Sequence, residues 1–262
     1  MIDIDYLEAR LPVEGLGKPL HVFSTIGSTN DEAKALAERG ASHGTLVVAD
    51  EQSEGRGRFD RKWHSEPGSG LALSLIMRPR LTSRVDTQLT ALGALAVVDS
   101  LVERGVEAWI KWPNDVIVSE GKLAGVLVET SWRGNDIDYA IVGIGVNIRP
   151  GSIPQVELEY PATCVDHAVG DRQNREDFLL DLVRNFGSWY RIVGSDEIID
   201  AWQQRLAFRN EQVFLRGKDS TTFGQLEGLD ANGRLMIRLD SGETIVVSEG
   251  DLSLRPIDSD KD

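Results

Sequence analysis

The sequence has little of several features that define particular classes of protein. It has one cysteine, Cys164, in 262 residues. A single cysteine excludes an internal disulfide framework and any zinc site built from several cysteines. The four histidines are scattered with no pair four residues apart, so a histidine-based metal site is not predicted either. Binding of a hard cation through carboxylates stays open.

Positive charge and long hydrophobic runs are also scarce. The 28 Lys and Arg residues stand against 42 Asp and Glu, giving a net charge of −14, so the average surface repels a phosphate backbone. The first residues lack the basic and apolar regions of a secretory signal. The longest uncharged stretch, Pro67–Met77, is too short and too rich in Gly and Ser to span a bilayer. We therefore expect a cytoplasmic protein that binds neither DNA nor a membrane.

What is present is the composition of a globular protein, 41% hydrophobic and 27% charged. Residues 21–30 suggest a short strand that ends in a loop. Periodicity and end signals predict helices over 31–39, 87–104, 175–193 and 195–207. Strands are predicted over 44–51, 71–79, 107–112, 115–118, 123–130 and 138–148. After Ala207 the pattern changes to short alternating strands with DANG and DSGE turns, which predicts a small all-β barrel. We expect an α+β protein with domains at 1–208 and 209–262.

The most unusual segment is the basic loop GRGRFDRKW at 55–63, inside an aperiodic stretch that is expected to be a loop. It carries four cations against the single acid Asp60. Gly55 and Gly57 allow close approach of the backbone to a ligand, and guanidinium groups suit carboxylate or phosphate. A solvated basic loop is an equally good interpretation. The segment lacks the third glycine of a dinucleotide motif and the GK[ST] of a P-loop.

The segment KWPND at 111–115 places polar side chains at a corner between two strands. Pro113 ends the first strand, and the Asn and Asp that follow it favour a turn. An ordinary turn explains those three residues. The Lys-Trp pair before them is harder to explain as turn chemistry.

Two apolar strands carry further candidates. In KLAGVLVE, at 122–129, Lys122 opens the strand and Gly125 interrupts it, which often marks a close backbone approach. In GIGVNI, at 143–148, Asn147 lies among aliphatic residues and must be hydrogen-bonded. A backbone partner and a ligand are both open for this side chain.

In this order the segments resemble biotin protein ligases (biotin–[acetyl-CoA-carboxylase] ligases). The matching elements are GSTND at 27–31, the Q-x-x-GRGR-x-x-R-x-W loop from Gln52, KWPND, KLAGVLVE, GIGVNI and the terminal DLSLRP. The resemblance extends from about residue 21 to the C-terminus. It implies the class II synthetase-like, biotin/lipoate ligase fold: a mixed catalytic sheet with flanking helices, followed by a small SH3-like β-barrel.

The resemblance also implies ATP-dependent biotinylation in two steps. The biotin carboxylate attacks the α-phosphate of MgATP to give biotinyl-5′-AMP, and the acyl group then passes to a specific lysine of a biotin carboxyl carrier protein. ATP and biotin are the expected substrates and Mg²⁺ the expected metal. The expected partner is the carrier domain of acetyl-CoA carboxylase or a related carboxylase. Monomers and homodimers both occur in the family, so the oligomeric state stays open.

By residue, the resemblance implies three sets of contacts. Lys122, Arg56 and Arg58 would be catalytic, because cations offset the repulsion between a carboxylate and a polyphosphate. The biotin and acyl-adenylate site would comprise Ser28, Thr29, Asn30, Gln52, Arg56, Gly57, Arg58, Lys122 and Gly125. The nucleotide would contact Trp63, Lys111, Asn114, Asn147, Asp251 and Arg255, and Asp115 would bind Mg²⁺.

Two departures and three alternatives accompany this interpretation. Family loops commonly have glycine where this chain has Asp60. Some twenty residues precede the matching region, whereas the winged helix-turn-helix of repressor-type members needs about sixty, so the ligase-only class is expected.

A lipoate or octanoate ligase of this fold is disfavoured because no RR-x-x-GG segment is present. A non-catalytic biotin-binding regulator is a second alternative, and nucleic-acid binding by the acidic terminal strands is a third.

Overall fold

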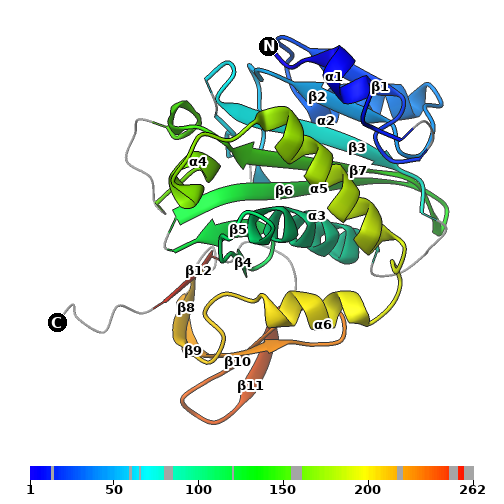
Figure 1. The fold of residues 1–262 in the computed structure, drawn as a ribbon. Coiled ribbons are helices and arrows are strands. Elements are labelled where there is room, and N and C mark those ends of the chain that lie inside the picture. Colours follow the sequence, from blue (N-terminus) through cyan, green and yellow to red (C-terminus); the bar gives the residue numbers. More distant parts are fainter. Residues whose placement is uncertain are drawn as a thin grey trace.

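The computed structural model describes residues 1–12, 15–58, 61–64, 66–79, 85–119, 121–154, 161–216, 221–247 and 253–256, with only the backbone at 85, 215, 216 and 253–256. A seven-stranded sheet lies at its centre (Figure 1). The strand order is β1-β2-β3-β7-β6-β5-β4, and of these pairs β1–β2 is parallel while the others are antiparallel. The sheet is therefore mixed, as expected. Its strands are β1 (Leu20–Phe23), β2 (Leu46–Ala49), β3 (Gly70–Met77), β4 (Trp109–Lys111), β5 (Asp115–Val118), β6 (Gly121–Arg133) and β7 (Asp136–Asn147).

Helices cover both faces of this sheet. They are α1 (Ile4–Glu8), α2 (Thr29–Glu38), α3 (Val85–Val102), α4 (Val165–Val169), α5 (Arg175–Tyr190) and α6 (Glu197–Gln204), with a 3₁₀ turn η2 (Pro150–Ser152). The helices α3 and α5 pack against each other in front of the sheet (Figure 1). The five-residue helices α1 and α4 were not predicted, because so short a segment shows no periodicity.

Alternation along the strands assigns each side chain to one face. In β2, Leu46 and Val48 belong to the large core formed with α3 and α5. Val47, between them, belongs to a smaller cluster with Ala33 and Ala37 of α2. Successive side chains of a strand point to opposite faces. Helix α2 therefore covers the face of the sheet opposite to α3 and α5.

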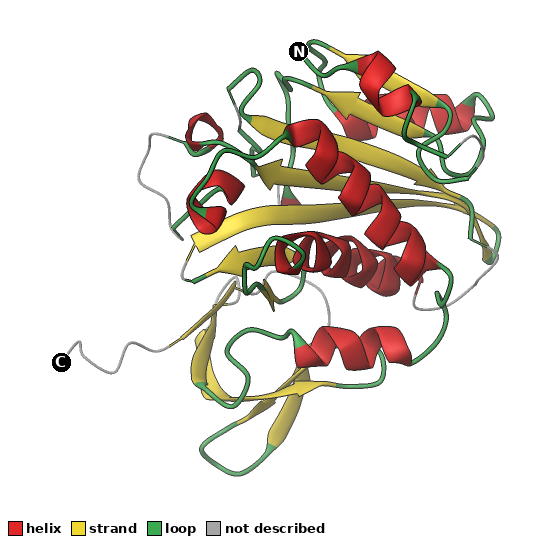
Figure 2. Ribbon diagram, viewed as in Figure 1, coloured by secondary structure: helices red, strands yellow, loops and turns green. Residues whose placement is uncertain are grey.

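The small C-terminal β domain expected from the sequence is present as a five-stranded antiparallel sheet in the order β11-β10-β9-β8-β12. Figure 2 shows it below the large sheet, next to α6. Its strands are β8 (Gln212–Arg216), β9 (Thr221–Leu229), β10 (Leu235–Arg238), β11 (Thr244–Val247) and β12 (Ser253–Pro256). Within the described ranges, no helix combines the length and apolar character needed to cross a membrane.

Candidate active site

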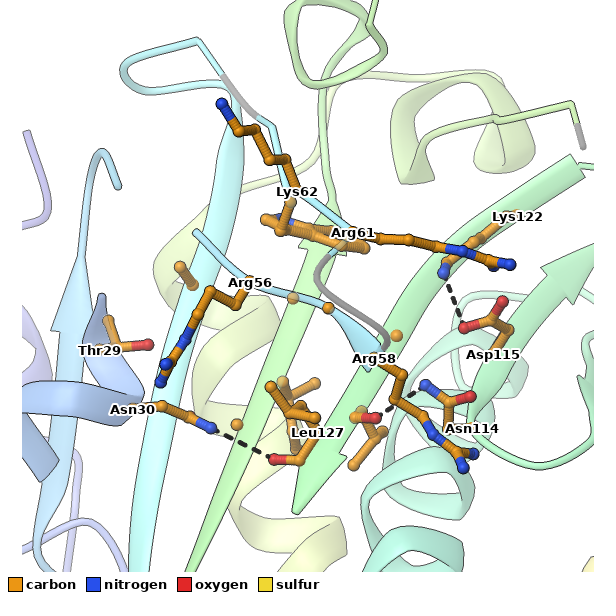
Figure 3. A pocket seen from close by; sticks show the side chains of 18 of the residues that line it. Thr29, Asn30, Arg56, Arg58, Arg61, Lys62, Asn114, Asp115, Lys122 and Leu127 are labelled. Atoms are coloured by element: carbon orange, nitrogen blue, oxygen red, sulfur yellow. Dashed lines mark hydrogen bonds and ion pairs between the residues drawn. The ribbon is translucent and has the colours of Figure 1, made fainter. Parts of the chain in front are cut away.

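A cavity of about 170 Å³ opens beside the N-terminal end of α2, between β6, β7, the β4–β5 turn and the basic loop that follows β2. Figure 3 shows Thr29 and Asn30 at one end of it and Lys122 with Asp115 at the other. Most of the residues predicted for the site line this cavity: Ser28, Thr29, Asn30, Gln52, Arg56, Gly57, Arg58, Trp63, Lys111, Asn114, Asp115, Lys122 and Gly125. These predicted residues come from four separate segments of the chain, which the fold brings together.

The floor of the cavity is a row of residues with small side chains or none. In the sheet, Ala72 of β3 lies opposite Gly145 of β7, which lies opposite Gly125 of β6. Two residues along, Ser74 lies opposite Gly143. Residues two apart in a strand face the same side. Gly143 and Gly145 thus leave the cavity-facing side of β7 without side chains of its own at these two positions.

These glycines are required because side chains from other segments occupy the space above them. A Cβ atom on Gly143 would lie 2.1 Å from Oδ1 of Asn30, and one on Gly145 would lie 2.5 Å from Cε2 of Trp63. Both distances are too short for any substitution without movement of the neighbour. The bare strand therefore holds Asn30 and the Trp63 indole directly against the backbone of β7.

The GSTN and Gln52 segments meet because the parallel pairing of β1 and β2 continues beyond both strands. Ile26 and Gln52 form a parallel bridge, and the N–H of Ser53 donates to the carbonyl of Ile26 over 2.9 Å. Oε1 of Gln52 then accepts from the backbone N–H of Thr29 (2.8 Å) and from its hydroxyl (3.1 Å). With its oxygen so engaged, the Gln52 amide offers its N–H groups to a ligand.

Asn30 completes an uncharged hydrogen-bonding end of the cavity. Its Nδ2 donates to Oε2 of Glu129 (2.6 Å) and to the carbonyl of Leu127 (3.5 Å), and its Oδ1 accepts from the hydroxyl of Ser74 (2.6 Å). These contacts set the orientation of the amide. Sequence reasoning missed Ser74 and Glu129, although each is a polar residue within an apolar strand and had to have a partner.

Lys122 points into the cavity because of a bulge in β6. Lys122 and Gly125 are three residues apart and would face opposite sides of a regular strand. The register of β6 against β5 shifts between Val116 and Ile117, so β6 has one extra residue between Lys122 and Gly125. The ammonium group of Lys122 consequently lies 2.7 Å from Oδ1 of Asp115. It also lies 5.8 Å from the centroid of the Trp63 ring.

The described part of the basic loop is a hairpin rather than an irregular loop. The N–H of Trp63 donates to the carbonyl of Gly55 (2.9 Å), and the N–H of Gly57 donates to that of Arg61 (2.7 Å). A Cβ atom on Gly55 would lie 2.5 Å from the carbonyl oxygen of Trp63, so this pairing requires glycine. The departure from the family pattern at Asp60 lies outside the described residues.

Arg56 reaches back from this hairpin to the end of the cavity that holds Thr29 and Asn30. Its guanidinium group lies 2.5 Å from Oδ1 of Asp31 and 3.5 Å from Oε1 of Glu129. Two carboxylates therefore balance its charge, and it ties the hairpin to α2 and β6. Figure 3 shows the Arg58 side chain beside Asn114, whereas Lys62 points away from the other labelled residues.

The KWPND segment forms the tight turn between β4 and β5. Lys111 lies opposite Asp115 across this turn, and the Trp112–Pro113 peptide bond is cis. Nδ2 of Asn114 donates to the carbonyl of Val126 (2.9 Å), so the turn is attached to β6 as well as facing the cavity.

One predicted residue that the structure describes, Asn147, lies away from the cavity, and two others fall wholly or in their side chains outside the described residues. Asn147 is not among the lining residues, and its Nδ2 donates to the carbonyl of Thr163 (3.1 Å). Of its two interpretations, the backbone partner is the one observed. Arg255 is described only as backbone, on β12 opposite Phe214. Asp251 lies outside the described residues.

Comparison with known proteins agrees with this geometry. Residues 22–147 match the biotin/lipoate A/B protein ligase family, and residues 209–255 match the biotin protein ligase C-terminal domain. A biotin–[acetyl-CoA-carboxylase] ligase from Paracoccus denitrificans is 35% identical over 234 residues, which cover 84% of this chain and 94% of that protein. The chain belongs to the biotin protein ligase family.

This chain is also similar to other biotin protein ligases, in structure as well as in sequence. The ligase from Aquifex aeolicus in complex with biotin and ATP is 31% identical, with a TM-score of 0.78 over 92% of this chain and 100% of that chain. The bifunctional ligase/repressor BirA from Bacillus subtilis is 34% identical over 238 residues, which cover 88% of this chain and 73% of that protein. The family resemblance and the fold class predicted from the sequence are therefore confirmed.

Proposed function

We propose that this protein is an ATP-dependent biotin ligase that forms biotinyl-5′-AMP and transfers biotin to a lysine of a carrier protein. One observation carries the proposal: the cavity has a hydrogen-bonding end at Thr29 and Gln52, where the charge of Arg56 is paired with carboxylates, and an end with an ammonium group at Lys122. Biotin has the same polarity, with a ureido ring at one end and a carboxylate at the other. The cavity lining also includes apolar residues such as Leu73, Val126 and Leu127, which suit the apolar middle of the molecule.

In the first step, a carboxylate oxygen of biotin bonds to the α-phosphorus of ATP, and the bond from that phosphorus to the pyrophosphate oxygen breaks. Two anions must approach each other, and negative charge increases on the transferred phosphoryl oxygens. Lys122 is held at this end of the cavity by Asp115, and Lys111 lies in the adjacent turn. A fixed ammonium group at the point of charge development lowers the barrier.

In the second step, the neutral ε-amine of the carrier lysine bonds to the acyl carbon, and AMP leaves with the electrons of the acyl–oxygen bond. The amine gives up a proton in forming the amide. Before this step the mixed anhydride must be kept from water. The hairpin that carries Arg56 and Arg58 closes one side of the cavity and is suited to this task.

The metal in this reaction arrives with ATP as part of the substrate. Among the described residues, no group of three or more His, Cys, Asp or Glu side chains could hold a metal ion. Among the described residues that line the cavity, Asp115 is the one with a carboxylate. Magnesium bound to phosphates commonly takes one or two carboxylates from the protein. Asp115 fits that role, and it would exchange part of its contact with Lys122 to do so.

The remaining assignments rest on the family match of each residue. The biotin end would comprise Ser28, Thr29, Asn30, Gln52 and Gly57, with Arg58 and Gly125 nearer the acyl-adenylate. The nucleotide would extend over Trp63 and the β4–β5 turn. The C-terminal domain, 209–262, would contribute Asp251 and Arg255 to the triphosphate of ATP bound by the catalytic domain, 1–208. The carrier would be the biotin domain of acetyl-CoA carboxylase or a related cytoplasmic carboxylase.

Intact mass spectrometry of a carrier domain tests the proposal. The domain is incubated with this protein, ATP and either biotin or lipoate. The expected result is an increase of one biotin minus one water, on one lysine, in the biotin reaction alone. Modification by lipoate instead would support the lipoate ligase alternative. Binding of biotin with no modification and no pyrophosphate release would identify a non-catalytic regulator.

A further inference from the structure

Arg175, the first residue of α5, lies outside the cavity but contacts both ends of the segment that carries the basic loop. Its Nη2 lies 2.7 Å from Oδ1 of Asp50, the residue that follows β2. Its Nη1 donates to the carbonyl of Gly70, the residue that begins β3 (3.2 Å). Residues 51–69 connect these two points and include Gln52, the basic hairpin and Trp63.

Placing Arg175 here costs free energy of folding that its role in α5 does not explain. Only 3% of Arg175 is exposed, and buried arginines are rare unless they are paired. A positive charge in the first turn of a helix also opposes the helix dipole. The side-chain cap of this helix comes from Asn174, whose Oδ1 accepts from the N–H of Asp177. Arg175 is therefore not needed to start α5.

Asp50 is itself held from more than one side. Its Oδ2 accepts from the backbone N–H of Ile2 over 3.0 Å, and its own N–H donates to the carbonyl of Phe23 over 3.0 Å. Two residues further along the chain, Gln52 makes its contacts with Thr29. A shift of Asp50 would consequently move the Gln52 amide relative to α2.

The second end of the segment is held by a different arginine as well. Nη1 of Arg149, just after β7, donates to the carbonyl of Gly68 over 2.8 Å, and its backbone N–H donates to the carbonyl of Ser69 over 2.9 Å. Among the described residues of the segment, those that Arg149 contacts lie at this end. Arg175 is the side chain that bridges Asp50 and Gly70, where the segment leaves and re-enters the sheet.

We propose that Arg175 is a positioning residue for ligation: by joining Asp50 to Gly70 it holds the 51–69 segment in the arrangement that binds biotin and retains the acyl-adenylate. It touches neither substrate and acts through Gln52 and the hairpin. The inference rests on the proposed function for its kinetic readouts, while the exchange of backbone amides in the segment can be measured without any reaction.

The principal variant is Arg175→Lys, which keeps a positive charge near Asp50 but cannot bridge to Gly70 as well, because lysine lacks the forked guanidinium group. The matched control is Arg184→Met on the same helix, which removes an arginine paired at the surface with Glu103 and Asp181. Because Arg175→Met alone leaves the buried Asp50 with only the Met1 N-terminal ammonium, 3.5 Å away, as a counter-charge, that change is made together with Asp50→Asn. Both Arg175 variants are compared with wild type well below their melting temperatures.

The expected result is a KM for biotin raised at least tenfold, with kcat within about threefold of wild type, since the chemical groups at Lys122 are unchanged. Hydrogen exchange should become at least tenfold faster at amides of 52–64 and stay unchanged in α5 and β6. The Arg184→Met control should match wild type in both measurements. Equal KM values for biotin in a folded Arg175→Lys variant would overturn the inference. Faster exchange spread evenly over the sheet would assign Arg175 to stability alone and would overturn it as well.

The two proposals fail in different ways. If the wild-type protein does not biotinylate a carrier domain, the proposed function is wrong. If the wild type is active and the Arg175 variants keep both the wild-type KM and the wild-type exchange in 52–64, only the positioning role is wrong.

Discussion

The indole N–H of Trp112 donates a hydrogen bond to the carbonyl of Gly233, 3.0 Å away and 121 residues later in the chain. Trp112 belongs to the β4–β5 turn that lines the cavity, and Gly233 belongs to the turn before β10 of the C-terminal sheet. The space at Gly233 is already filled, because a Cβ there would lie 2.8 Å from Thr87 and 2.9 Å from Trp202. The C-terminal domain thus supports the turn that carries Lys111 and Asp115.

The first prediction concerns this contact. Trp112→Phe removes the N–H donor and keeps an aromatic ring in place. Loss of one buried hydrogen bond costs on the order of 1 kcal/mol, so we expect a small drop in stability and a KM for ATP raised roughly three- to tenfold. Biotin affinity measured by calorimetry should not change, because the hydrogen-bonding end of the cavity lies on α2. An equal loss of biotin and ATP binding would contradict this separation.

Lys122→Ala should slow adenylate formation by about a hundredfold or more, the usual effect of removing a group that stabilises developing charge. The fold should persist, because the ammonium group is partly exposed and its partner Asp115 can be solvated. Pyrophosphate release with biotin and ATP measures the rate, and Lys34→Ala, an exposed lysine of α2, is the control. A wild-type rate for the Lys122 variant would remove this residue from the mechanism.

Arg58→Ala should impair the retention of biotinyl-AMP more than its formation. A charge-assisted contact contributes about 1.5–3 kcal/mol, so dissociation should accelerate roughly ten- to a hundredfold. The escaping adenylate would then label lysines of an unrelated protein such as albumin, detectable with streptavidin. Lys62→Ala removes the same charge from the same hairpin at a residue that borders the cavity but points away from the other labelled side chains (Figure 3), so it should leave albumin unlabelled. Unchanged dissociation with slower adenylation would place Arg58 in the chemical step instead.

Gly143→Ala should weaken biotin binding at least tenfold, because the new methyl group takes the space of the Asn30 amide. Asn30→Ala alone should also weaken binding, by removing contacts with Ser74 and Glu129. In the double variant the shortened side chain removes the clash, so the two losses should not add. The expected coupling is in the range of about 0.5–3 kcal/mol for residues in contact. Additive losses in calorimetry would show that Gly143 does not act through Asn30.

The stability of the fold should depend on pH through His43. Burial, and then the charge of Arg78, lower the pKa of His43 from its usual 6.5, and its Nδ1 accepts a hydrogen bond from the N–H of Arg78. Below pH 6.5 the unfolded chain therefore binds a proton that the folded chain does not. The free energy of unfolding should fall as the pH drops from 6.5 to the lowered pKa, and not further from this cause.

The test compares the wild type with His43→Gln, which keeps a hydrogen-bond acceptor that does not titrate. Melting temperatures are measured from about pH 7.5 to pH 5. The variant should lose less stability over the acidic half of this range than the wild type does. Identical pH profiles would show that His43 does not contribute to the acid sensitivity.

The sequence by itself determined the elements and the family. Long periodic segments such as α3, α5 and β7 were predicted within a few residues, because periodicity over ten or more residues depends on local pattern alone. The motifs GRGR, KWPND and KLAG identified the family without any knowledge of strand order. They also indicated most of the residues that line the cavity, because a motif keeps its residues together in sequence whatever the fold does around it.

Only the tertiary structure decided which of these residues face one another. The bulge that turns Lys122 toward Asp115 depends on the register between β5 and β6, and the two partners of Arg56 come from α2 and β6. Ser74 belongs to the site only because β3 pairs with β7, which places Ser74 opposite Gly143. Arg175 was absent from the sequence interpretation for the same reason. Its partners lie 125 and 105 positions earlier, and pairing over such separations is set by how the sheet and helices pack rather than by any local pattern.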